Sequence, residues 1–137
     1  MQENYILVPV LIQVILTLSI YIRLGQVKEK AVKDGEVDAS RRPLHEDAWP
    51  DSVLQVNNNI RNQFETPVLF YILCISLWLT NGVTALALAL AGIYAGVRIA
   101  HAYVHLGTNE IRLRKRLFQL SVVLLFALCG ILFIAIL

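Results

Sequence analysis

Hydrophobic residues along the chain are grouped into four segments that are separated by polar stretches. Residues 5–24 and 117–137 are almost continuously apolar, and each matches the roughly 20 residues that a helix needs to cross a hydrocarbon core. The two middle segments, 66–79 and 83–97, are too short to span alone. The pattern predicts one all-α domain, residues 1–137, folded as an integral membrane four-helix bundle with helices at about 5–24, 53–80, 83–106 and 112–137.

The two middle segments form a helical hairpin, because only Thr80, Asn81 and Gly82 lie between them. To reach the far side of a bilayer, the second helix must include residues before Thr66, and the third must include residues after Val97. Those extensions are polar. We therefore expect polar side chains from both helices to lie at one depth of the bundle.

The basic residues predict the orientation of the chain. They lie between the first and second helices and between the third and fourth: Arg23, Lys28, Lys30, Lys33, Arg41, Arg42, Arg61, Arg112, Arg114, Lys115 and Arg116. The positive-inside rule places both groups in the cytosol and both termini on the opposite side. The residues from about 25 to 52 are expected to form a solvated loop.

Composition supports a membrane protein and excludes other classes. Hydrophobic residues make up 57% of the chain, above the roughly 45–50% of soluble domains. The net charge of +2 gives no indication of nucleic-acid binding. Cys74 and Cys129 lie in apolar segments, where a core or lipid-facing role is expected. No basic residue precedes the first apolar segment, so no signal peptide is predicted.

Two polar stripes follow from the helical period. On the second helix the stripe consists of Asn58, Arg61, Asn62 and Glu65, and on the third it consists of Tyr94, Arg98, His101 and His105. An ionic group facing lipid at mid-bilayer costs about 2.5–3.5 kcal/mol even on lenient scales. The stripes are therefore expected to face one another or a neighbouring chain.

Structural roles are possible for each residue taken alone. Arg61 and Glu65 have the spacing of an intrahelical ion pair, Arg98 could extend to the interface, and the histidines could be satisfied interior groups. Their convergence at one depth favours a binding or catalytic site, because intramembrane ionisable residues are usually functional.

The residue types restrict the chemistry of that site. His101 and His105 are spaced like two metal ligands, but a third histidine and a carboxylate cluster are missing. The chain has no hydrolase elbow and no glycine-rich phosphate loop. Guanidinium and amide donors suit a small ligand with carboxylates, and Glu65 could bind its ammonium group. Arg112, Arg114 and Arg116 add positive charge nearby.

The motifs RNQFETP and RIAHAYVHLG, together with GQVK and RLRKR, resemble the MAPEG family, the membrane-associated proteins in eicosanoid and glutathione metabolism. The resemblance covers the whole chain. Within this family, the sequence is similar to the branch of the microsomal prostaglandin E synthases and microsomal glutathione transferases.

The resemblance implies a homotrimer that binds glutathione between neighbouring subunits on the cytosolic side. By motif, Arg61, Asn62 and Glu65 match residues that hold glutathione, and Arg98 and His101 match polar contacts from the next helix. Lys28 matches a basic residue at the end of the first helix. Arg114 matches the arginine that activates the thiol, and no metal is implied.

The chain also departs from the family pattern. His105 stands where relatives often carry a tyrosine, Asn58 replaces an arginine, and Lys115 stands where the prostaglandin synthase has a serine. These departures argue against prostaglandin isomerisation. The resemblance then implies a glutathione transferase or peroxidase with glutathione as co-substrate, acting on lipophilic electrophiles that arrive from the membrane lipids.

Two other functions stay open. A non-catalytic protein of the same fold could bind a lipid headgroup or another anionic metabolite. A small transporter is less favoured, because the stripes lie at one end of the bundle and no broken helix is predicted. The short loops favour a bacterial inner membrane over the endoplasmic reticulum.

Overall fold

The computed structural model describes residues 3–137, and all of its regular elements are helical. The elements in chain order are η1 (Glu3–Ile6), α1 (Leu7–Lys33), η2 (Glu46–Ala48), α2 (Asp51–Gln63), α3 (Thr66–Leu79), α4 (Ala85–Leu106) and α5 (Ile111–Ala135). The all-α fold expected from the sequence is confirmed. Three stretches are long and apolar enough to cross a membrane, namely Glu3–Lys33, Ala85–Leu106 and Ile111–Ala135.

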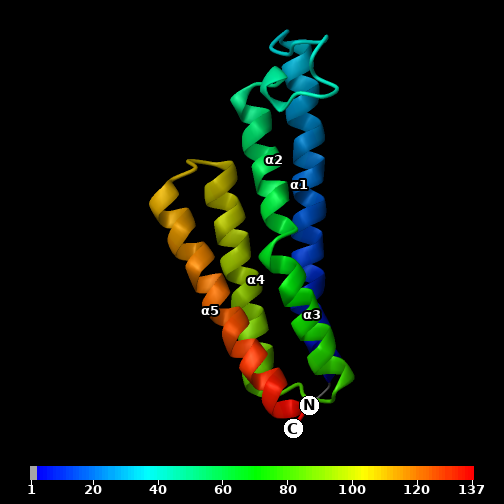
Figure 1. The fold of residues 1–137 in the computed structure, drawn as a ribbon, viewed down its shortest axis with the longest axis vertical. Helices are drawn as coiled ribbons and strands as arrows, with labels where there is room; N and C mark the ends of the chain where they lie inside the picture. Colours follow the sequence, from blue (N-terminus) through cyan, green and yellow to red (C-terminus); the bar gives the residue numbers. More distant parts are fainter. Residues whose placement is uncertain (1–2) are drawn as a thin grey trace.

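The helices form an elongated bundle in which α2 and α3 together make up the fourth rod (Figure 1). Both ends of the described chain lie at one end of the bundle, and the loops α1–α2 and α4–α5 lie towards the other. We call this second end the basic end, because the α1–α2 loop contains Arg41 and Arg42 and the first turns of α5 contain three further arginines. The α1–α2 pair extends further in this direction than the α4–α5 pair.

The first helix is longer than the sequence pattern indicated. It was expected to end near Leu24, but α1 continues through Gly25 to Lys33. The extension has its own apolar face: Val27 and Ala31 are buried in a cluster with Val53 and Val56 of α2. The loop is therefore shorter than the range 25–52 that was expected.

The second helix, expected to run continuously over residues 53–80, is divided into α2 and α3 at Phe64 and Glu65. Pro67 lies in the first turn of α3. Proline has no backbone N–H and its ring crowds the carbonyl four residues earlier, so a helix is favoured to end before it and begin again around it. The expectation of one continuous helix is wrong at this point.

The turn between α3 and α4 is tight. Asn81 has a φ of 53°, and the Gly82 N–H donates to the Leu77 carbonyl at 2.8 Å. A Cβ on Gly82 would lie 2.6 Å from the Cβ of Ala135, so only glycine permits this approach of the turn to α5. The side chain of Thr84 then caps α4 by accepting from the Ala87 N–H.

A cluster of buried amides joins α1 to α2. The Gln13 side chain donates to Gln63 Oε1 at 2.7 Å, and Gln63 Nε2 donates to Asn59 Oδ1 at 3.0 Å. Asn59 in turn donates to the Ala102 carbonyl of α4 at 3.2 Å. These three side chains have almost no exposed surface, so their hydrogen bonds fix the register of three helices in a region that water does not reach.

We predict that Gln63→Leu lowers the free energy of unfolding by roughly 1–2 kcal/mol, because the Gln13 and Asn59 amides lose a partner in a buried site. Denaturation in mixed micelles measures this change. The double variant Gln13→Leu/Gln63→Leu should lose less than the sum of the single variants. Ser19→Ala, which removes an exposed side-chain hydrogen bond on α1, is the control, and additive losses in the double variant would contradict the coupling.

Candidate functional site

A pocket of about 350 Å³ lies between the C-terminal end of α2, the helix α4 and the first turns of α5. We call it the Arg114 pocket, and it is lined by Asn62, Glu65, His101, Ile111, Arg114, Lys115 and Phe118. Four of the residues singled out in the sequence, Asn62, Glu65, His101 and Arg114, therefore lie around one pocket, although they come from three helices.

Arg98 is a fully buried cation next to this pocket. Its Nη2 atom donates to the Asn62 carbonyl at 3.1 Å. Its Nε and Nη1 atoms find no hydrogen-bond partner among residues 3–137. Because a buried charge is costly unless it is paired, the guanidinium has unused capacity to bind an anion beside Asn62.

Of the two histidines of α4, His101 lines the Arg114 pocket and His105, one turn later, does not. His101 and His105 are both buried, and their ring centroids are 5.8 Å apart. Neither Nδ1 atom has a partner within the described chain. No group of three or more His, Cys, Asp or Glu side chains that could hold a metal occurs in residues 3–137, so the pair is better suited to hydrogen bonding than to metal binding.

Arg114 enters the pocket from the first turn of α5, which begins at Ile111. Its guanidinium donates to the side chain of Asn109. Asn109 has a φ of 55°, a left-handed conformation that asparagine tolerates better than most residues. The α4–α5 turn thus holds Arg114 at the edge of the pocket, and Lys115 adds a second cation there.

Arg61 and Lys28 line a different pocket of about 370 Å³, formed by the ends of α1 and α2 and by the loop between them. We call it the Lys28 pocket. Arg61 makes an ion pair with Glu46 of this loop, so the possible pairing of Arg61 with Glu65 does not occur. The Lys28 ammonium lies 4.9 Å from the centre of the Trp49 ring, a cation–π distance.

The loop is held by its own polar contacts. Arg41 donates to Asp47 at 2.7 Å. This hydrogen bond lowers the pKa of the Asp47 carboxyl below its ordinary value. The loop therefore keeps Glu46 near Arg61 through a neighbouring ion pair rather than through burial.

The last two residues expected in the site lie elsewhere. Asn58 is exposed on α2, and its carbonyl accepts from the Asn62 side chain at 3.0 Å. Tyr94 is buried in the apolar core and stacks on Phe70 with ring centroids 4.2 Å apart. Within one chain, neither residue lines the Arg114 pocket or the Lys28 pocket.

Several residues that line the two pockets or hold their side chains were not predicted from the sequence. Phe118 and Ile111 line the Arg114 pocket as ordinary apolar residues of α5, and no sequence signal separates them from their neighbours. Glu46 and Trp49 lie in a loop whose conformation the pattern does not specify. Asn109 had a detectable signal, because asparagine is common in left-handed helix ends.

We predict that Arg98→Met leaves the thermal midpoint of the ligand-free protein unchanged or raises it. Methionine fills a similar volume and removes a buried charge that is only partly paired. A thermal scan in detergent measures this, with Asn59→Leu as a buried-polar control that should lower the midpoint. A large loss of stability in Arg98→Met would mean that the guanidinium serves packing rather than an anion.

Comparison with known proteins places the chain by family. The model of the MAPEG family matches residues 6–134. No curated protein and no solved structure gives a significant match. The match covers nearly the whole chain and agrees with the helical, membrane-spanning architecture. The chain therefore belongs to the MAPEG family and is an integral membrane protein of this family of eicosanoid and glutathione metabolism.

Proposed function

We propose that the protein is a glutathione transferase or peroxidase acting on lipophilic electrophiles, in the branch of the microsomal prostaglandin E synthases and glutathione transferases. The observation that carries the proposal is the Arg114 pocket, where an amide, a carboxylate and a cation surround a space beside the incompletely paired Arg98. Membership in a family that includes glutathione transferases supports the same activity.

The pocket residues suit the charges of glutathione. Arg98 and the Asn62 amide bind a carboxylate of the peptide, and Glu65 binds its ammonium group. His101 and His105 donate or accept hydrogen bonds at the inner wall. In this proposal the basic end faces the cytosol and the termini face away, so that the peptide enters from the aqueous side.

A homotrimer completes the site. Asn58 and Arg61 of α2 and Glu65, just before the apolar helix α3, are exposed polar residues. Facing lipid with this surface is unfavourable, so a neighbouring subunit covers it. The Lys28 pocket and the Arg114 pocket of adjacent subunits then contribute to one glutathione site, with Tyr94 supporting Arg98 from the core.

The chemistry follows from Arg114. A thiol with a pKa of about 8.5 is only a few per cent ionised at neutral pH, and a guanidinium close to the sulfur favours the thiolate. For conjugation, the thiolate forms a C–S bond with an electrophilic carbon. In a substitution the leaving group departs with the electron pair of the broken bond, and in an addition the electron pair of the double bond moves to the neighbouring atom, which takes a proton. For reduction, the thiolate attacks the terminal oxygen of a hydroperoxide, the O–O bond breaks, and the alkoxide that leaves takes a proton to give the alcohol. The thiol of a second glutathione then attacks the sulfenic acid, which gives a disulfide and water.

We predict that Arg114→Ala lowers glutathione-dependent kcat/KM by about 10²–10³-fold, the usual cost of removing one group that stabilises a developing anion. A spectrophotometric assay with glutathione and an aryl halide measures it. The residual activity should rise with pH as the free thiol ionises near pH 8.5. Arg116→Ala, an exposed cation on the same helix, is the control, and an Arg114→Ala variant with full activity and an unchanged pH profile would remove Arg114 from the mechanism.

We also predict saturable binding of glutathione in isothermal titration. S-methylglutathione should bind as well, because the pocket holds the peptide rather than the thiol, and Glu65→Gln should weaken binding about tenfold.

A competing function is that of a non-catalytic protein that binds a lipid headgroup, which the exposed Asn58 and the buried His105 favour. Saturable heat with glycerol phosphate and none with glutathione would support that function instead.

A further inference from the structure

The basic residues at the start of α5 are divided between two faces of the helix. Arg114 and Lys115 line the Arg114 pocket, whereas Arg112 and Arg116 do not line it and are exposed. Arg112 and Arg116 are four residues apart, which places them on one face of the helix. Arg114 is two residues from each of them and is therefore turned away by about 160°. We call Arg112 and Arg116 the outer arginine pair.

The face of the outer arginine pair continues along α5 as an apolar strip. By helical spacing this strip consists of Val123, Ala127, Gly130 and Ile134. All four residues are exposed. The helix α5 lies at the edge of the bundle, where it packs against α4 and α3 (Figure 1). Because α5 is long and apolar enough to cross a membrane, the strip is the part of the helix that borders the acyl chains of the bilayer.

The outer arginine pair lies at the depth of the lipid phosphates. The apolar part of α5 begins at Leu117, and about 20 residues from that point span the roughly 30 Å of a hydrocarbon core. Arg116 then lies at the boundary of the core, and Arg112 lies about 6 Å beyond it. The headgroup region on each side of the core is roughly 5–8 Å thick, so both guanidinium groups lie within it.

No acidic side chain among residues 3–137 forms an ion pair with either arginine of the outer pair. The ion pairs in this part of the chain are Lys30–Asp34, Lys33–Glu29, Arg41–Asp47 and Arg61–Glu46. The exposed guanidinium groups therefore have donors available for a ligand. The planar fork of a guanidinium matches the oxygen atoms of a phosphate in a bidentate geometry.

We propose that the outer arginine pair binds the phosphate of one anionic phospholipid per chain, with the acyl chains of that lipid lying against the apolar strip. Charge complementarity favours a headgroup with net negative charge, because arginines directly outside a membrane-spanning helix attract anionic lipid. The adjoining apolar strip favours a lipid over a soluble phosphate. The lipid is a bound structural ligand rather than a substrate, and its site is separate from the Arg114 pocket.

The first test measures lipid binding to the whole protein without any turnover. Delipidated protein in detergent is titrated with phosphatidylglycerol or with phosphatidylcholine of the same acyl chains, and native mass spectrometry counts the bound lipids. The variant Arg112→Gln/Arg116→Gln removes the outer arginine pair. The matched control is Lys30→Gln/Lys33→Gln, which removes two exposed cations from the end of α1, about 9 Å or more beyond Leu24.

We expect the wild type and the control to bind phosphatidylglycerol roughly 10–30-fold more tightly than phosphatidylcholine, because each arginine beside an anionic headgroup contributes about fivefold. Arg112→Gln/Arg116→Gln should bind the two lipids equally. A wild type without preference, or the same loss in the control, would overturn the proposal. Competition by free glycerol phosphate as strong as by phosphatidylglycerol would also overturn it, because the site would then take a soluble phosphate. A smaller oligomer in Arg112→Gln/Arg116→Gln would assign this face to a second copy of the chain and reject the lipid.

The second test separates a built phosphate site from general attraction. Arg112→Lys/Arg116→Lys keeps both charges but removes the guanidinium forks. We expect this variant to retain a preference for phosphatidylglycerol while binding it several-fold more weakly than the wild type, with an unchanged thermal midpoint. Added salt should reduce the preference in both proteins. Binding by the lysine variant that equals that of the wild type would show that charge alone attracts the lipid and would reject the site.

Discussion

A buried guanidinium must be surrounded by polar atoms, and Arg98 imposes this requirement on the centre of the bundle. Its side chain has no exposed surface, and among the described residues its hydrogen-bond partner is the carbonyl of Asn62. Uncompensated positive charge in a low-dielectric region is costly. The described residues meet that demand only in part, because Nε and Nη1 of Arg98 have no hydrogen-bond partner among residues 3–137.

The helix α2 carries polar side chains on several sides, although its Val53, Val56 and Ile60 pack into a buried apolar cluster. One face of α2 carries the buried amides that join it to α1 and α4. Asn62 near the end of α2, and Glu65 just after it, line the Arg114 pocket beside α5, whereas Arg61 pairs with the loop residue Glu46. These polar side chains have different partners, so replacing any of them by leucine removes a specific contact.

Most of the fold could be predicted from hydrophobic patterning, because segment length alone decides whether a helix can cross a bilayer. The extension of α1 was missed, because GQVKEKAVK is polar in composition, and its apolar face consists only of Val27 and Ala31. The division at Phe64 and Glu65 was missed although Pro67 gives a direct signal for it. The hydropathy of a segment indicates whether it lies within the membrane, but it does not indicate whether its helix is continuous.

The sequence predicted which residue types form the candidate site, but it predicted less well which residues contact one another. Helical spacing alone was enough to bring Asn62 and Glu65 to one pocket with His101. It could not separate Arg61 from them, because the contact of Arg61 is Glu46, fifteen residues earlier in a loop without periodicity. Tyr94 has the helical spacing of the other polar residues on α4, but its ring stacks on the ring of Phe70. Spacing determines the face of a helix, whereas the neighbour on that face is a property of the tertiary structure.

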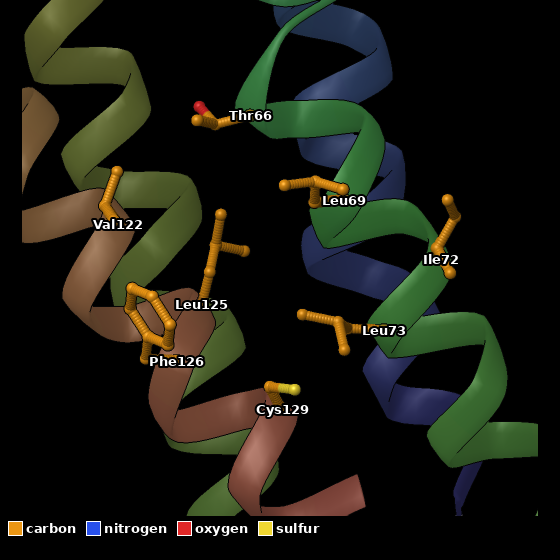
Figure 2. Close-up of a pocket in the computed structure, with 8 residues that line it drawn as sticks. All are labelled: Thr66, Leu69, Ile72, Leu73, Val122, Leu125, Phe126 and Cys129. Atoms are coloured by element: carbon orange, nitrogen blue, oxygen red, sulfur yellow. The ribbon is translucent and has the colours of Figure 1, made fainter.

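The break between α2 and α3 has a consequence for the relation between the two cavities. Glu65, the last residue before α3, lines the Arg114 pocket, and Thr66, the first residue of α3, lines an apolar groove of about 300 Å³ between α3 and α5 (Figure 2). Pro67 follows directly and restricts the backbone at this boundary. An uninterrupted helix would turn successive residues by about 100°, and Glu65 and Thr66 would then face directions set only by that rotation. The break instead gives each half its own phase, so that the polar half faces the charged pocket and the apolar half faces the groove directly beneath it.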